Sequence, residues 1–382
     1  MDNTIFNNWS ISNRLNDLPY SERVNVPALL GVFDRTTTSY KYIYFLSLLD
    51  ILEATGFNQL VIKYDDILLE MLANAWYPHN FFKLSFGVND RIAQELDRLN
   101  INLDGKRLTN NAASKQQLKE ILSYKDYTKN HLLDMVPYRL LTPFFADRLR
   151  REKDSRKNRL IFMLTYDQFD TAKPFYVFSA DYDAIIMNPE WMLYFYENLK
   201  VIRAFICWNW LEYMQRRNPS VPNLQMKLFP PNSRKNLSTQ TKFWKSVLQY
   251  KQLNCIFSGK PLTQKDVSID HFLPWSFVAH DQLWNLIPVS KSINSSKSNN
   301  LPSLKKYFSK FVSMQYAGLT TYNKHLGQVS WNKVIEPYVA DLRLKPEDIL
   351  DKMKLQNSLR STIEPLTSLA SAQGFSEGWL YG

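Results

Sequence analysis

Apolar residues along this chain recur mostly at helical spacing, and the strongest such segments lie in its first two thirds. The segment 40–54 is apolar on nearly its whole surface and follows four hydroxyl residues, which predicts a well-buried helix. Similar spacing predicts helices over 64–76, from residue 89 or 90 to about 99, and over 114–124.

The clearest helix start is Asn188-Pro189-Glu190, which supplies an N-cap, a proline at the first position and an acid in the first turn. We expect this helix to end near Arg216 or Arg217, because basic residues suit a helix C-terminus. Its many aromatic residues indicate a central, buried helix.

Two shorter apolar runs, 160–164 and 175–178, are interpreted as the strands of a hairpin. The stretch 219–231 is rich in Pro and Asn and is the preferred domain boundary. The prediction is an α+β fold with three parts. These are a mostly α-helical lobe over 1–230, a compact unit over 240–315 and a helical C-terminal tail over 316–382.

One stretch, 266–302, departs from the helical pattern and places polar residues at the ends of short apolar runs. Its first run predicts a strand that ends on the adjacent pair Asp270 and His271. A mixed loop follows, and Asn285 then precedes a second strand-like run.

A short polar helix is predicted directly after the second run. Ser290 is a good N-cap candidate, and the helix carries Asn294 and Lys297 before Pro302 ends it. The order of elements is therefore strand, loop, strand and helix, with polar side chains at the junctions.

These residue types suit the hydrolysis of a phosphodiester bond, which needs a base for the water and a cation for the leaving oxygen. A histidine titrates near neutral pH, and a hard cation accepts one carboxylate and one amide oxygen together with water. Successive side chains of a strand point to opposite faces, so Asp270 and His271 would serve different groups.

The spacing of these residues resembles the HNH endonuclease motif, the ββα-metal fold, and is especially similar to the HNH domain of Cas9. The resemblance covers roughly residues 250–310. It implies that His271 is the general base, that Asp270 and Asn294 bind one Mg²⁺ or Mn²⁺ ion, and that Asn285 orients the histidine. It also implies products with 5′-phosphate and 3′-hydroxyl ends.

Two further residues are candidates for binding the substrate. Lys297 lies three residues after Asn294 on the predicted helix, where it can meet the nucleic acid backbone. His280 lies in the loop, where it can contact a phosphate or lend a third metal ligand, or serve the loop without a chemical role.

Many HNH proteins carry two cysteine pairs that bind a structural zinc ion, and this chain departs from that pattern. It has two cysteines, Cys207 and Cys255, and Ser258 occupies the position of a second cysteine in the turn. We therefore expect no structural zinc. Packing of aromatic side chains is expected in its place, by Phe257, Phe272, Trp275 and Trp284.

The formal net charge is +11, and much of it is concentrated around the motif. The segment 233–310 holds twelve Lys and Arg residues against three Asp residues, which favours a polyanion such as DNA as the partner. The two distant cysteines suit a reducing, bacterial cytoplasm. The N-terminus shows no export signal, and no segment is apolar enough to span a membrane.

The sequence thus predicts a metal-dependent endonuclease that cleaves DNA, with a role in bacterial antiphage defence or restriction. The alternatives are a homing endonuclease of a mobile element and a non-catalytic subunit that binds nucleic acid in a larger complex. One site nicks one strand, so cleavage of both strands would need a homodimer or a second pass. An ATPase or sensor subunit is a further expected partner, through the N-terminal lobe.

Overall fold

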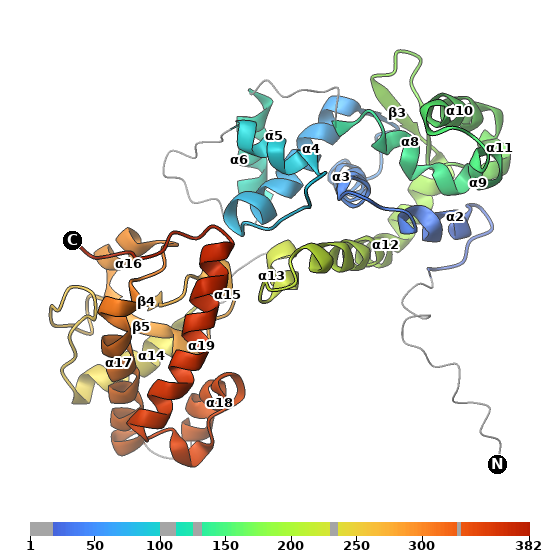
Figure 1. The fold of residues 1–382 in the computed structure, drawn as a ribbon. Helices are drawn as coiled ribbons and strands as arrows, with labels where there is room; N and C mark the ends of the chain where they lie inside the picture. Colours follow the sequence, from blue (N-terminus) through green and yellow to red (C-terminus); the bar gives the residue numbers. More distant parts are fainter. Residues whose placement is uncertain (1–17, 100–111, 125–131, 230–235, 327–329) are drawn as a thin grey trace, which may run out of the picture. The chain divides into compact units, whose positions relative to one another are not determined.

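The computed structural model describes residues 18–99, 112–124, 132–229, 236–326 and 330–382. The chain forms two compact units: Met1–Pro219 with Leu228–Asn232 is unit 1, and Ser220–Lys227 with Ser233–Gly382 is unit 2. Each unit combines helices with a small antiparallel sheet (Figure 1), which confirms the predicted α+β class. No helix among the described residues is both long and apolar enough to cross a membrane.

Helices make up most of unit 1. They are α2 (Val26–Leu30), α3 (Tyr40–Ala54), α4 (Tyr64–Trp76), α5 (Arg91–Leu99), α6 (Ala112–Ser123), α8 (Val136–Leu140), α9 (Ala146–Leu149), α10 (Asp154–Asp167), α11 (Phe169–Ala172) and α12 (Pro189–Arg217). Short turns of helix complete it: η1 (Gly31–Phe33), η2 (Tyr77–Phe81) and η3 (Thr142–Phe145). A further short helix, α13 (Leu224–Leu228), belongs to unit 2 except for its last residue.

The predicted central helices are confirmed. α3 is buried on almost every side because it packs against both α4 and α12, and this explains why its sequence lacks a distinct polar face. α12 begins as predicted, with Asn188 Oδ1 accepting a hydrogen bond from the Glu190 amide at 3.0 Å. It bends at Asn198, whose side chain donates to the Tyr194 carbonyl at 2.9 Å.

The sheet of unit 1 corrects one prediction. Its strands are β1 (Val61–Lys63), β2 (Tyr176–Phe178) and β3 (Ala184–Met187), in the antiparallel order β1-β3-β2. The predicted strand over 160–164 is wrong, because these residues belong to α10. A run of five apolar residues fits a strand or a helix equally well, and here the polar residues on both sides continue the helix.

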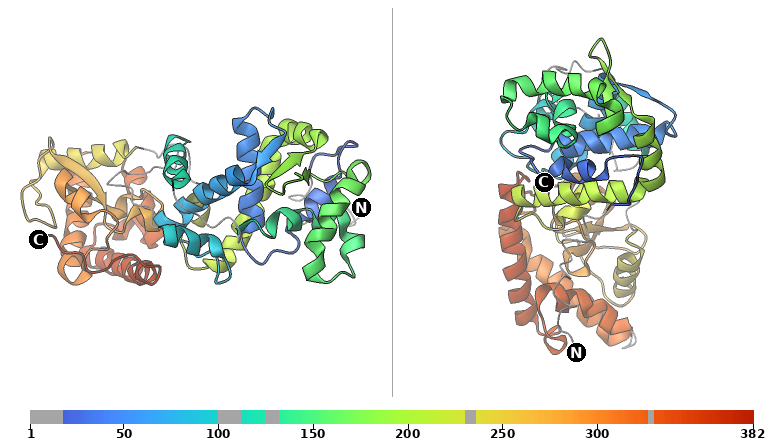
Figure 2. Two further views of the ribbon diagram at one scale, coloured as in Figure 1. Left: turned by 90° about the horizontal axis from the view of Figure 1, so that it is seen from above. Right: turned by 90° about the vertical axis from the view of Figure 1, so that its right-hand side faces the viewer.

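Unit 2 surrounds a two-stranded sheet with helices. The strands are β4 (Val267–His271) and β5 (Leu286–Ser290). The helices are α14 (Ser238–Tyr250), α15 (Trp275–Val278), η4 (Leu283–Asn285), α16 (Lys291–Lys297), α17 (Leu304–His325), α18 (Trp331–Leu342), η6 (Pro346–Asp348) and α19 (Lys352–Ala372). One hydrophobic core joins both strands to α14, α17, α18 and α19, and α19 lies against α17 (Figures 1 and 2).

The C-terminal residues return to the chain just after α16. The Leu301 amide donates a backbone hydrogen bond to the Ser376 carbonyl, and the Trp379 amide donates one to the Leu301 carbonyl. The Trp379 ring packs edge-on against Phe257 at 5.1 Å. The expected division of the chain at 230, 240 and 315 stays a prediction, but the C-terminal helices share their core with the hairpin.

Candidate active site

Four of the polar residues singled out in the sequence lie on two elements: Asp270 and His271 on β4, and Asn294 and Lys297 on α16. β4 pairs with β5 in the register Asp270 to Ile287 and His271 to Leu286, and α16 packs on both strands. The predicted strand, loop, strand and helix are therefore present. Asp270 and His271 are adjacent on β4, so their side chains leave the strand in opposite directions.

Asp270 is buried, with 6% of its side chain exposed, and it has one nearby cation. The ammonium of Lys297 lies 3.2 Å from Oδ2, but Oδ2 accepts no hydrogen bond from any described residue. Burial raises the pKa of Asp270 above its usual value, and Lys297 and His271 oppose this rise. Lys297 thus compensates part of the charge of this buried carboxylate, and carboxylate oxygens are ligands that hard cations prefer.

Lys297 lies in the interior and not on a surface that nucleic acid can reach. Its side chain is 0% exposed, and Nζ donates a hydrogen bond of 2.7 Å to the His271 carbonyl. One ammonium thus holds both the Asp270 carboxylate and the His271 main chain. The structure therefore does not place Lys297 where direct contact with the substrate, its predicted role, would require.

His271 pairs with an acid that the sequence reasoning missed. Its Nε2 lies 2.9 Å from Asp281 Oδ1, and 8% of its side chain is exposed. Asp281 follows His271 by ten residues, and the loop turns back so that the two meet. An acid one residue after His280 was visible in the sequence, but nothing there showed which histidine it would contact.

Asn285 fixes the loop that leaves His271. Its side chain is fully buried, and it accepts from the Leu273 amide at 2.8 Å and donates to the Leu273 carbonyl at 2.9 Å. Its own carbonyl accepts from the Phe272 amide at 2.8 Å. These bonds hold the two residues that follow His271, so Asn285 positions the histidine through the backbone.

Asn294 lies on α16 and reaches across to β4. Its Nδ2 donates to Ser268 Oγ at 3.0 Å and to the Ile269 carbonyl at 3.3 Å. Both contacts use the amide nitrogen. Ser268 and Asp270 are two residues apart on β4, so their side chains leave the same face of the strand. Among the described residues, no group of three His, Cys, Asp or Glu side chains converges on one point. A hard cation held by one carboxylate, one amide oxygen and water needs no such group.

His280 packs against Trp284, with 5.2 Å between the ring centres, and its Nδ1 accepts from the Gln282 amide at 3.3 Å. Burial lowers the pKa of His280 to about 4, so the ring is neutral near pH 7. A neutral ring held against a tryptophan offers no positive charge to a phosphate. The structure therefore does not favour the predicted contact of His280 with the substrate.

The turn that carries Cys255 is closed by backbone and aromatic contacts. The Gly259 amide donates to the Cys255 carbonyl, and the Cys255 amide donates to the Lys260 carbonyl, both at 2.8 Å. Phe257 packs edge-on against Tyr307 at 4.9 Å. Phe272 stacks on an aromatic ring of α17, and Trp284 donates from its indole nitrogen to an aspartate of α18.

The part of the chain that holds the site is rich in exposed lysines. Nine lysines between residues 242 and 310 are exposed, and in that range Lys297 alone is buried. They are Lys242, Lys245, Lys251, Lys260, Lys265, Lys291, Lys305, Lys306 and Lys310. A surface of this charge attracts polyanions.

Comparison with known families gives one finding. Residues 255–303 match the family model described as HNH endonuclease, and this segment contains Asp270, His271, Asn285 and Asn294. Comparisons with curated proteins and with solved structures gave no match. The match supports the resemblance seen in the sequence and indicates a nuclease that acts on nucleic acid. HNH endonucleases generally use a divalent metal ion.

Proposed function

We propose that this chain, whose residues 255–303 belong to the HNH endonuclease family, hydrolyses DNA phosphodiester bonds with one Mg²⁺ or Mn²⁺ ion. The observation that carries the proposal is the buried Asp270 oxygen without a hydrogen-bond donor, next to His271 and within the reach of α16. Asp270 and Asn294 would hold the cation. The cation would stabilise negative charge on the scissile phosphate and the leaving oxygen.

His271 takes the proton of the attacking water in this proposal. Asp281 Oδ1 would accept a hydrogen bond from the Nε2–H of the neutral His271 ring, and this tautomer has its lone pair on Nδ1. Lys297 fixes the main chain of the same histidine, and Asn285 fixes the main chain of the two residues that follow it. The exposed lysines bind the DNA backbone by charge, so binding should weaken with salt.

The proposed role in bacterial antiphage defence or restriction rests on the resemblance. It would leave sensing, target choice or the binding of an ATPase partner to unit 1. A homing endonuclease would cut one long defined site, whereas a defence nuclease would cut many sites or would need a trigger. Digestion of unrelated DNA substrates separates these roles.

The test is nicking of a supercoiled plasmid by the full-length protein with Mg²⁺ or Mn²⁺, beside His271→Ala and Asn294→Ala. Because the first lacks the base and the second lacks a cation ligand, we expect each to reduce the rate at least ~100-fold. His325→Ala and Asn299→Ala are matched controls, because both residues are exposed and lie outside the site.

Equal nicking by His271→Ala and the wild type would refute the assignment of the base. Asp281→Asn tests whether Asp281 positions the His271 ring for catalysis or only supports the fold. We expect a rate between those of the wild type and His271→Ala, with unfolding unchanged. DNA binding without cleavage under all metal conditions would instead favour the non-catalytic alternative.

A further inference from the structure

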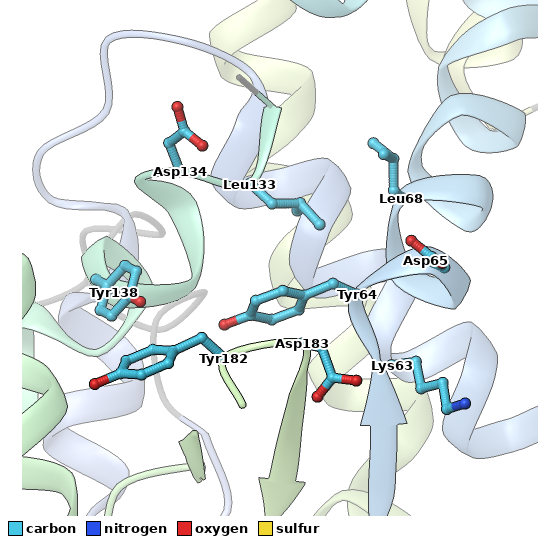
Figure 3. Close-up of a pocket in the computed structure, with 9 residues that line it drawn as sticks. All are labelled: Lys63, Tyr64, Asp65, Leu68, Leu133, Asp134, Tyr138, Tyr182 and Asp183. Atoms are coloured by element: carbon cyan, nitrogen blue, oxygen red, sulfur yellow. The ribbon is translucent and has the colours of Figure 1, made fainter. Parts of the chain in front are cut away.

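Unit 1 contains a pocket of about 560 Å³ at the point where α4, α8 and the β2–β3 turn meet (Figure 3). Nine residues line it, and six of them are aromatic or acidic. These are Tyr64, Tyr138 and Tyr182, with Asp65, Asp134 and Asp183. The volume lies within the range of ~300–1,000 Å³ that is typical of sites for small ligands.

Two of the tyrosines are fixed by a continuous stack of rings. Tyr138 stacks on Phe178 with 4.5 Å between ring centres, and Tyr182 stacks on Phe162 at 4.7 Å. Phe162 and Phe178 stack on each other at 5.6 Å, so all four rings form one row. The pocket is thus lined by aromatic rings whose orientation is set before any ligand enters.

Tyr64 completes this aromatic lining. Figure 3 shows its ring extending from the start of α4 toward Tyr138 and Tyr182. Its hydroxyl is buried and has no hydrogen-bond partner among the described residues. Burial raises the pKa of Tyr64, and Tyr138 and Asp183 add to the rise, so this hydroxyl stays neutral. It remains available to a ligand as donor or acceptor.

The charge of the pocket is opposite to that of the whole chain. Three aspartates and one lysine line it, although the chain carries a net charge of +11. Lys63 is that lysine, and its ammonium points away from the three tyrosines in Figure 3. The carboxylate of Asp183 favours a cation over a phosphate in this pocket.

We propose that this pocket binds an organic cation that carries an ammonium or guanidinium group. The tyrosine rings would face the charged group, since an aromatic face attracts a cation, and Asp183 would supply negative charge. The cation can come from a free polyamine or from a Lys or Arg side chain of a peptide. This binding is separate from the proposed cleavage of DNA.

The test is isothermal titration calorimetry of the full-length protein with three cations: spermidine, N-acetylargininamide and N-acetyllysinamide. AMP serves as the anionic control. We expect saturable binding of at least one cation to one site, and none of AMP. Preference for spermidine identifies a free polyamine, and preference for either amino acid derivative identifies a peptide side chain.

Variants place the binding in this pocket. Asp183→Asn and Tyr138→Leu should each weaken binding about two- to fivefold, and the double variant about tenfold. Tyr138→Phe keeps the ring and should bind as the wild type does. Asp170→Asn and Tyr124→Leu are matched controls, because both residues are exposed and lie outside the pocket.

Three results would overturn the proposal. They are the absence of saturable cation binding, equal affinity in the double variant and the wild type, and tighter binding of AMP than of the cations. Far-UV circular dichroism of each variant verifies its fold. If Tyr138→Leu does not fold, Asp183→Asn alone decides, since an asparagine oxygen can still accept the hydrogen bond from Ser179 Oγ.

Discussion

Replacing Lys297 with methionine removes a positive charge from a place that solvent does not reach. Methionine keeps the length and most of the volume of the side chain, so the change is mainly electrostatic. It leaves the His271 carbonyl without its donor and the Asp270 carboxylate without its nearby cation. We expect Lys297→Met to destabilise unit 2 while leaving the structure of unit 1 unchanged.

The size of the effect follows from the burial of the pair. Asp270 is 6% exposed and Lys297 is 0% exposed, so water cannot replace the lost ammonium. Removing one partner of a buried ion pair typically costs ~3–5 kcal/mol of unfolding free energy. We expect about 3 kcal/mol, because the pair is not in ideal hydrogen-bond geometry and the carboxylate can take up a proton.

Urea unfolding in EDTA, followed by peptide-resolved hydrogen exchange of β4 and β5, measures this cost. Lys291→Met is the matched control, since Lys291 is exposed on the same helix. Asp270→Asn combined with Lys297→Met removes both charges together. We expect this double variant to be more stable than the sum of the single effects by at least ~1 kcal/mol.

If Lys297→Met lowers the free energy of unfolding no more than Lys291→Met does, the Lys297 ammonium does not compensate the charge of Asp270. Strict additivity in the double variant would lead to the same conclusion. Added Mg²⁺ gives a further check, because a cation bound at Asp270 would restore part of the stability that Lys297→Met loses.

Two further predictions concern other parts of the chain. Lys115 and Arg203 outweigh the effect of burial on Asp50, so the pKa of Asp50 is lower in the folded than in the unfolded chain. The stabilisation that Asp50 contributes to folding is therefore full above its unfolded pKa of ~3.9, and it is lost as the pH falls through the lower folded pKa. Asp50→Asn should cost about 2 kcal/mol at pH 7, and the difference from the wild type should shrink below about pH 4 in urea unfolding; a constant difference would refute this. Gln315→Leu removes the acceptor of the Tyr338 hydroxyl at 2.6 Å and a donor to the β5 backbone. We expect it to lower the free energy of unfolding by about 2 kcal/mol in the same assay, and a loss below ~0.5 kcal/mol would contradict this prediction.

The sequence predicted local structure well where several local signals agreed. The Asn188-Pro189 start, the long aromatic helix and the strands that end on His271 and precede Ser290 are all present. The run 160–164 failed because five apolar residues contain too few turns to separate the two periods. The strand β1 lies far from β3 in the chain, so their pairing is not a local property.

The amino-acid sequence by itself determined which chemical groups are present and in what order. The Asp-His pair, the two asparagines and the concentration of lysines around them can be seen from residue types and spacing alone. The same information predicted the α+β class and the order of strand, loop, strand and helix. These properties depend on neighbours in the chain, which the sequence displays directly.

Only the tertiary structure decided which side chains meet. It placed Lys297 in the interior on Asp270, brought Asp281 to His271 and turned Asn285 onto the loop backbone. It also assembled the pocket of unit 1 from three separate segments. Such contacts depend on how α16 and the loops pack on β4, and that packing is set by burial over the whole unit and not by local spacing.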